Sequence, residues 1–238
     1  MQKVEEEVAV PAGKATIEGN LVIPAGAKGI ALFAHGSGSG RFSPRNRYVA
    51  KVLNKAGIGT LLVDLLTKEE EEIDVATAEF RFNIGLLTQR LIGATEWLKR
   101  NPATKNLALG YFGASTGAAA ALVAATKFPK DIKAVVSRGG RPDLAMEHLR
   151  EVGAPTLFIV GGKDIAVLDL NKKAMEQIPA EKKLEIVSGA THLFEEPGKL
   201  EEVARLSADW FLAHFSQTPS HKFEGVLKNS RKVASSEF

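Results

Sequence analysis

Short runs of apolar residues alternate with longer amphipathic segments along most of the chain. Runs such as 29–34 (GIALFA) and 156–160 (TLFIV) have the length and side-chain types of buried strands. The segments between them carry apolar residues at the spacing that is typical of helices packed on one face. This alternation predicts β-α-β units, and therefore an α/β fold with a mostly parallel sheet and helices on both faces.

About eight strands and six helices are expected, with no internal repeat. The first two strands form an antiparallel pair around a Pro-Ala-Gly-Lys turn. The strands are expected at 6–10, 15–23, 29–34, 59–65, 107–112, 134–137, 156–160 and 184–187. The helices are expected at 44–55, 75–99, 115–128, 144–151, 168–177 and 200–215. Residues 75–99 are expected to form one long helix, preceded by a polar loop.

The composition fits a folded protein of average type. The chain has 238 residues, of which 45% are hydrophobic and 25% are charged. It contains no cysteine, which excludes a disulfide scaffold, a thiolate metal site and a cysteine nucleophile. Residues 1–215 are expected to form one folded domain. The Ser-rich segment 216–238 is expected to be a flexible tail, with an interaction segment as the alternative.

The charge of the chain gives little indication of a partner. The formal net charge is +3, of which residues 216–238 supply +2, so the body is close to neutral. This weak field does not favour nucleic-acid binding. The N-terminal MQKVEEEVAV has glutamates where a signal peptide carries positive charge, and no apolar run reaches the ~18 residues of a membrane helix. We therefore expect a cytoplasmic protein without a membrane partner; the oligomeric state is not predicted.

The strongest chemical signal is the pentapeptide Gly-Ala-Ser-Thr-Gly at 113–117, which fits G-x-S-x-G. It lies between a buried strand and an alanine-rich helix, the context of a nucleophile elbow. Small residues tolerate the crowding of such a turn, and the turn exposes the Ser115 hydroxyl. The Thr116 backbone N–H then points from a helix N-terminus towards developing negative charge. The alternative is a tight turn whose serine is only a helix N-cap.

A serine nucleophile requires a base, and the base requires an acid to orient it. Asp164 follows the expected strand 156–160, and His192 follows the strand 184–187, in the chain order Ser, Asp, His. Parallel strands bring such loops to one edge of the sheet. Asp169 is an alternative acid, although its place in the first turn of a helix suits helix stabilisation. The remaining histidines after Ser115 lie within helices or in the tail.

The loop His-Gly-Ser-Gly-Ser-Gly at 35–40 follows the third expected strand and is the candidate for the second half of an oxyanion hole. The Ser37 backbone N–H is the first candidate donor, and Gly38 is the second. His35 is expected to brace the loop. A dinucleotide fingerprint is the competing interpretation, but its third glycine would fall on Arg41. No cofactor and no metal are therefore expected.

The four loop sequences HGSGSG, GASTG, GGKD and GATH together resemble the α/β-hydrolase superfamily. The segments LLTKEEEEID, RFNIGLL and SRGGRPDL are similar to its dienelactone hydrolase-related branch. This resemblance covers roughly residues 5–215 and implies an α/β-hydrolase fold. Dienelactone hydrolases proper use a cysteine nucleophile, whereas this chain has Ser115. The resemblance therefore implies general ester or lactone hydrolysis by a serine enzyme.

The expected substrate is a small soluble ester or lactone. Only residues 139–153 separate the sixth expected strand from the seventh, so no lid domain is expected and the site should be open. Arg138 and Arg141 are candidates to bind a substrate carboxylate, and Gly38 to line the site; the alternative for the arginines is a salt bridge or loop anchor. The acidic run 69–72 is interpreted as a solvated loop rather than a metal site.

Other functions remain open within and outside this class. A thioesterase, an amidase or a promiscuous phosphotriesterase would use the same residues. A binding protein that has lost catalysis on a hydrolase fold is the alternative from another class.

Overall fold

The computed structural model describes residues 3–216, so the expected tail lies almost entirely outside the described residues. Eight strands form one sheet in the order β1-β2-β4-β3-β5-β6-β7-β8. β1 and β2 are antiparallel to each other, and β2 is antiparallel to β4, whereas all other neighbours are parallel. The predicted mostly parallel α/β sheet is confirmed. The strands are β1 (Val4–Ala12), β2 (Ala15–Ile23), β3 (Gly29–Ala34), β4 (Gly59–Val63), β5 (Ala108–Ala114), β6 (Ile132–Arg138), β7 (Thr156–Gly161) and β8 (Lys182–Val187).

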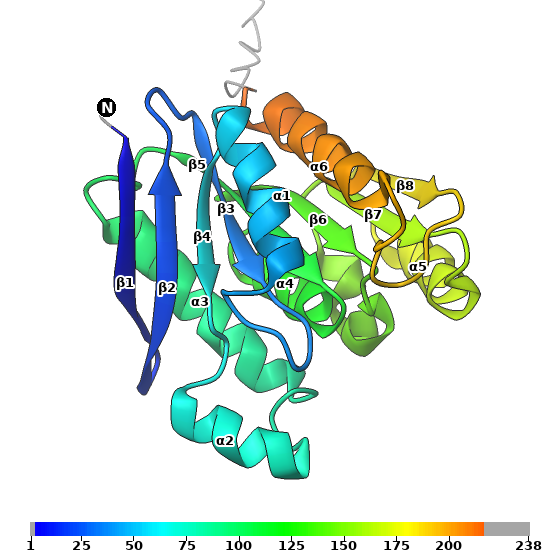
Figure 1. The fold of residues 1–238 in the computed structure, drawn as a ribbon, viewed down its shortest axis with the longest axis horizontal. Coiled ribbons are helices and arrows are strands. Elements are labelled where there is room, and N and C mark those ends of the chain that lie inside the picture. Colours follow the sequence, from blue (N-terminus) through cyan, green and yellow to red (C-terminus); the bar gives the residue numbers. More distant parts are fainter. Residues whose placement is uncertain (1–2, 217–238) are drawn as a thin grey trace, which may run out of the picture.

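Helices cover both faces of this sheet (Figure 1). On one face α1 and α6 pack against each other over a core that includes Phe33, Phe112 and Phe211. On the other face α3, α4, α5 and a 3-10 helix, η1, enclose a second core around Tyr111 and Phe158. The helices are α1 (Pro44–Lys55), α2 (Lys68–Thr77), α3 (Ile84–Arg100), α4 (Thr116–Lys127), η1 (Pro142–Glu151), α5 (Ile165–Gln177) and α6 (Lys199–Phe215).

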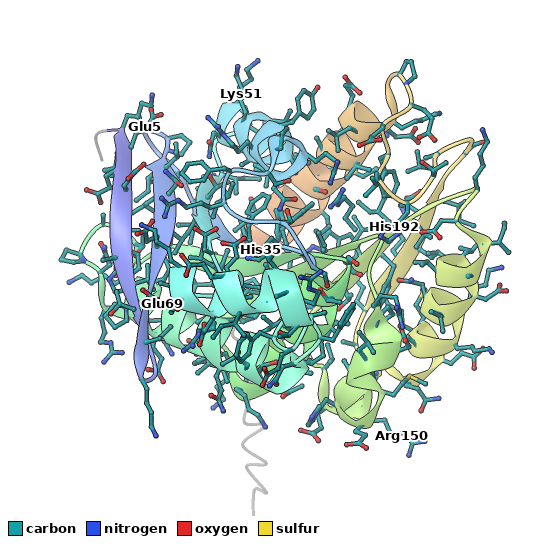
Figure 2. All side chains as sticks on the ribbon, turned by 60° about the horizontal axis from the view of Figure 1, so that its bottom comes forward. Glu5, His35, Lys51, Glu69, Arg150 and His192 are labelled. Atoms are coloured by element: carbon teal, nitrogen blue, oxygen red, sulfur yellow. The ribbon has the colours of Figure 1, made fainter. Side chains whose placement is uncertain are left out.

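The central strands are apolar because both of their faces are covered. Every residue of β3, β4 and β7 is buried, so these strands read as continuous apolar runs. β2 instead alternates, with Ile17, Gly19, Leu21 and Ile23 buried and the residue between each neighbouring two of them more exposed. In Figure 1 the arrowheads of β3 and β4 point down and, because the sheet twists, those of β6 and β8 point to the right; the bottom of this view comes forward in Figure 2. The loops that carry the candidate residues are therefore gathered at one edge.

The expected single helix at 75–99 is wrong, because the chain forms two helices there. α2 begins after Thr67, whose hydroxyl accepts the Glu70 N–H while the Glu70 carboxylate accepts the Thr67 N–H. This reciprocal capping box makes residues 69–72 part of a helix and not of a loop. α2 ends at Thr77 and is followed by Ala78, which has a left-handed φ of 58°; α3 starts after Asn83.

The connection between β6 and β7 contains η1, at the place where a short helix is expected. No helix within residues 3–216 has the length and apolar character needed to cross a membrane.

Candidate active site

Ser115 occupies a strained turn between β5 and α4. Its φ of 50° and ψ of −122° lie outside the ordinary regions for a residue with a side chain. The Ser115 N–H donates to the Arg138 carbonyl at 3.2 Å, and the Ser115 carbonyl accepts from Arg141 N–H at 3.0 Å. These two bonds to the end of β6 hold a conformation that the backbone does not favour by itself. Strain of this kind is often found where a side chain has to be presented for chemistry.

The small residues beside Ser115 are required by close backbone contacts. A Cβ at Gly113 would lie 2.4 Å from the Ala118 Cα, and a Cβ at Gly117 would lie 2.2 Å from the Ala34 carbonyl oxygen. Both distances are far below any real contact. The first part of α4 is fully buried from Thr116 to Ala125, so its alanines let the helix lie against the sheet.

His192 and Asp164 meet at the same edge, from the loops after β8 and β7. Nδ1 of His192 lies 2.6 Å from a carboxylate oxygen of Asp164. Since an ionised carboxylate only accepts, Nδ1 carries the hydrogen and Nε2 of a neutral ring has a free lone pair. The Lys163 N–H donates to the Ala190 carbonyl at 2.9 Å, which ties the two loops together. The imidazole keeps 38% of its side-chain surface exposed, so it is accessible.

Residues 138–141 connect this pair to Ser115. A Cβ added to Gly139 would lie 3.4 Å from Nδ1 and Cε1 of His192, so the ring packs over this glycine. Gly139 itself has a φ of +50°. The adjoining residues Arg138 and Arg141 make the backbone bonds to Ser115. Among the described residues no hydrogen bond joins the Ser115 hydroxyl to His192 directly.

The alternative acid and one other histidine lie in different surroundings. Asp169 is 61% exposed and faces Lys172 on its own helix. His214 is buried in α6, where Nδ1 donates to the Trp210 carbonyl at 2.8 Å. Neither is placed to serve Ser115.

The loop after β3 lies against Ser115. A Cβ at Gly36 would come within 2.9 Å of the Ser115 Cβ. The hydroxyls of Ser37 and Thr116 lie 3.1 Å apart. The two residues whose backbone N–H groups are the candidate oxyanion donors are therefore neighbours. Within residues 3–216, no hydrogen bond occupies the backbone N–H of either residue. Gly38 follows with a φ of +64°. Two free N–H donors thus stand next to the candidate nucleophile.

His35 holds this loop to the next strand. Its Nε2 accepts the Leu65 N–H at 2.9 Å, and its Nδ1 donates to the Gly36 carbonyl at 2.9 Å. Burial lowers the pKa of His35 below its usual value, although the Gly36 carbonyl and the carboxylates of Asp64 and Glu71 act in the opposite direction. Both ring nitrogens are used by the backbone, so His35 has no free position for taking a proton from Ser115. Figure 2 shows His35 near the middle of this edge and His192 to its right.

The two candidate arginines have opposite surroundings. Arg141 makes a bidentate pair with Asp143, at 2.8 and 2.7 Å. Arg138 is only 7% exposed, and its guanidinium makes no hydrogen bond or ion pair to any residue that the structure describes. Its guanidinium lies 6.0 Å from the Phe194 ring. Burial, with the nearby charge of Arg45, lowers the pKa of Arg138 to about 10. Arg138 is thus a buried cation without a counterion, whereas Arg141 is already neutralised.

The acidic run does not form a cation site. Glu70 binds Arg90 through an ion pair of 2.5 Å. Across the described part of the chain, no cluster of three or more His, Asp or Glu side chains has a geometry suited to a metal ion.

The sequence interpretation missed a buried ion pair beside the loop after β3. Asp74 in α2 binds Arg81, with 2.7 Å between the carboxylate and Nε. The carbonyl of Arg81 accepts a hydrogen bond from the Ser37 hydroxyl at 3.3 Å. Together with Ser37 and Thr116, these two residues line a pocket. A Thr-x-x-Glu capping signature at 67–70 was the available sequence signal for α2.

Comparisons with known proteins agree with this architecture. The sequence pattern of the dienelactone hydrolase family matches residues 17–216. A dienelactone hydrolase from Anabaena variabilis, known from a crystal structure, is 59% identical, with a TM-score of 0.88 over 90% of this chain and 99% of that one. A dienelactone hydrolase-like promiscuous phosphotriesterase from metagenomic libraries is 13% identical with a TM-score of 0.73, over 90% of this chain and 99% of that one, and shares the fold.

Two curated relatives from Mycobacterium tuberculosis strains are each 57% identical over 210 residues, or 88% of this chain. Both carry the name "Putative phosphoribosyl transferase", and the matched region is 46% of their length. The chain therefore spans about half of these relatives. The family match and the fold lead to one conclusion: the chain belongs to the dienelactone hydrolase family.

Proposed function

We propose that the protein is a serine hydrolase that cleaves small carboxylic esters or lactones through an acyl-enzyme intermediate. Ser115 is the nucleophile, His192 is the general base and acid, and Asp164 orients the imidazole. The backbone N–H groups of Thr116 and Ser37 bind the oxyanion. The observation that carries this proposal is the strained Ser115 turn at the edge where His192 and Asp164 are 2.6 Å apart.

In the acylation step, the Ser115 Oγ attacks the carbonyl carbon while Nε2 of His192 takes the hydroxyl proton. The carbonyl oxygen becomes an oxyanion, to which the free N–H groups of Ser37 and Thr116 donate. The carbon–oxygen bond to the leaving group then breaks, and the imidazolium gives its proton to the departing alkoxide. Asp164 stabilises the imidazolium through the bond to Nδ1.

In the deacylation step, water replaces the alcohol and follows the same route in reverse. Nε2 of His192 takes a proton from water as the hydroxide oxygen attacks the acyl carbon. The bond to Ser115 Oγ breaks, and the proton passes to that oxygen. The products are a free acid and the original enzyme, so no cofactor is consumed.

The surroundings of the arginines refine the substrate proposal. Because Arg141 is paired with Asp143 through Nε and Nη2, its charge is already neutralised by a carboxylate. Arg138 has unpartnered Nε and Nη1 atoms and lies at the end of β6, next to Ser115. We therefore assign recognition of an anionic substrate group to Arg138. Gly38, on the loop after β3, lines the substrate site.

The name of the mycobacterial relatives does not compete with this proposal. Their matched half corresponds to the dienelactone hydrolase region of this chain, and the name applies to proteins about twice as long. We place the hydrolase activity in the matched half.

The proposal is tested with Ser115→Ala. This variant should fold normally, hydrolyse no p-nitrophenyl acetate and resist labelling by a fluorophosphonate. Ser188→Ala is the matched control, since Ser188 is an exposed serine on the loop after β8. Undiminished turnover by Ser115→Ala would refute the proposal. A panel of esters, thioesters, amides and phosphotriesters with the wild-type protein then ranks the substrate classes.

A further inference from the structure

The segment between β4 and α3 contacts the loop that carries Ser37. This segment contains α2 and the turn 78–83, and Figure 2 shows α2, marked by Glu69, at the front of the edge that also carries His35. It lines the pocket that Ser37 and Thr116 share. The mechanism proposed above assigns no role to this segment.

Asp74 organises the turn after α2. One carboxylate oxygen accepts the Phe80 and Arg81 N–H groups at 2.7 and 2.8 Å, and the other accepts Arg81 Nε at 2.7 Å. Asp74 is only 3% exposed. Burial alone would raise its pKa, but the N–H groups of Arg81 and Phe80 and the Arg81 guanidinium hold the pKa below its usual value. The carboxylate therefore stays charged and keeps the turn in place.

The turn reaches the candidate oxyanion loop through one hydrogen bond. The Arg81 carbonyl can only accept, so the Ser37 hydroxyl must donate its hydrogen to it. The Thr116 hydroxyl, 3.1 Å away, is then left to donate to Ser37 Oγ. Because the Arg81 carbonyl can only accept, it determines which group donates in the Ser37–Arg81 bond and in the Thr116–Ser37 bond. This chain of contacts runs from Asp74 through Arg81 and Ser37 to Thr116.

We propose that Asp74 is a positioning residue for the oxyanion hole, acting through the Arg81 carbonyl on Ser37 and Thr116. The proposal rests on the hydrolase function proposed above. Ser37 sits on a loop that contains three glycines, so its N–H direction is not fixed by the local backbone alone. The hydroxyl bond to Arg81 supplies the missing restraint. A misdirected donor weakens stabilisation of the oxyanion without removing the substrate site.

The experiment compares Asp74→Asn with Ser37→Ala and with the double variant, in the full chain. Active sites are counted by fluorophosphonate titration, and kcat per titrated site is measured with p-nitrophenyl acetate. Each single variant should lose about tenfold or more in kcat, with KM little changed, because a small displacement of a catalytic donor has a large effect. The double variant should lose no more than the more damaged single variant, because both changes break the same chain.

Glu72→Gln is the matched control, since it makes the same carboxylate-to-amide change on the exposed side of α2. It should keep the wild-type kcat. A wild-type kcat per titrated site in Asp74→Asn would overturn the proposal, and so would single-variant losses that multiply in the double variant. If Asp74→Asn does not fold, Ser37→Ala carries the test, because it removes the hydroxyl that donates to the Arg81 carbonyl. An unchanged kcat in Ser37→Ala is also contrary to the proposal.

Ser115→Ala in the same series separates the two proposals. Ester hydrolysis by Ser115→Ala would refute the proposed hydrolase mechanism itself. An inactive Ser115→Ala together with an unaffected Asp74→Asn would remove only the role of Asp74.

Discussion

Nδ1 of His192 lies 2.6 Å from the carboxylate of Asp164, while the other ring nitrogen has no partner among the described residues. This relationship fixes which nitrogen carries the hydrogen. An amide at position 164 could donate to Nδ1 and so favour the opposite tautomer, in which Nε2 is protonated and cannot act as a base.

Asp164→Asn should therefore lower kcat for ester hydrolysis by about 10³–10⁴-fold with little effect on stability. Steady-state kinetics with p-nitrophenyl acetate, combined with a thermal unfolding curve, measure both quantities. Asp169→Asn is the control, because Asp169 is exposed and faces Lys172. A larger loss of kcat in Asp169→Asn than in Asp164→Asn would show that Asp164 is not the acid that orients His192.

Arg138→Met should make the protein more stable and less active towards anionic esters. The substitution removes a buried charge that has no counterion, so the free energy of unfolding should rise by about 1 kcal/mol. The loss of a charge-assisted bond should lower kcat/KM for carboxylate-bearing esters by about 10- to 100-fold relative to neutral esters.

Denaturant unfolding and paired substrates measure these two effects. Arg141→Met is the comparison, since it breaks the Asp143 pair and should show neither the gain in stability nor the selectivity change. Equal losses on neutral and anionic esters in Arg138→Met would contradict anion recognition.

Gly117→Ala should be severely destabilising, because the new methyl would lie 2.2 Å from the Ala34 carbonyl oxygen and 2.4 Å from that of His35. Neither oxygen can move without disturbing β3, so we expect a loss of about 3 kcal/mol or more in the free energy of unfolding. Gly153→Ala serves as the reference, since nothing lies within 4 Å of its added Cβ. Urea unfolding of both variants gives the difference, and similar midpoints would count against the close packing of α4.

Stability should fall as the pH decreases below about 6.5, partly because of His35. Burial lowers the pKa of His35 in the folded protein, so the unfolded chain binds the proton more readily there. The stabilisation is complete above the unfolded pKa and decreases as the pH falls below it. His35→Gln should show a smaller decrease over the same interval in denaturant unfolding. An identical pH dependence would show that His35 does not titrate differently on folding.

The fold was predictable because its central strands are buried on both faces. The apolar runs of β3 and β7 cannot be confused with amphipathic helices, and the loops at their ends carry the recognisable motifs. The chain order of Ser115, Asp164 and His192 also placed all three at the carboxyl edge of parallel strands. Their chemical roles remain proposals.

The break between α2 and α3 was not predictable from helical periodicity. Ala78 adopts a left-handed conformation although it is not glycine, because Asp74 binds the backbone N–H groups of Phe80 and Arg81. The role of Asp74 beside Ser37 escaped prediction for the same reason. Its partners include the backbone N–H groups of Phe80 and Arg81, and the positions of backbone groups cannot be predicted from the pattern of side chains.

The burial of α4 also limits how this protein could diversify. From Thr116 to Ala125 the helix has no exposed position at which a substitution could accumulate harmlessly. The segments at 64–83 and 139–153 border the same edge and do contain exposed residues. A change of the site's outer wall can therefore be made in these two segments without repacking the helix behind Ser115.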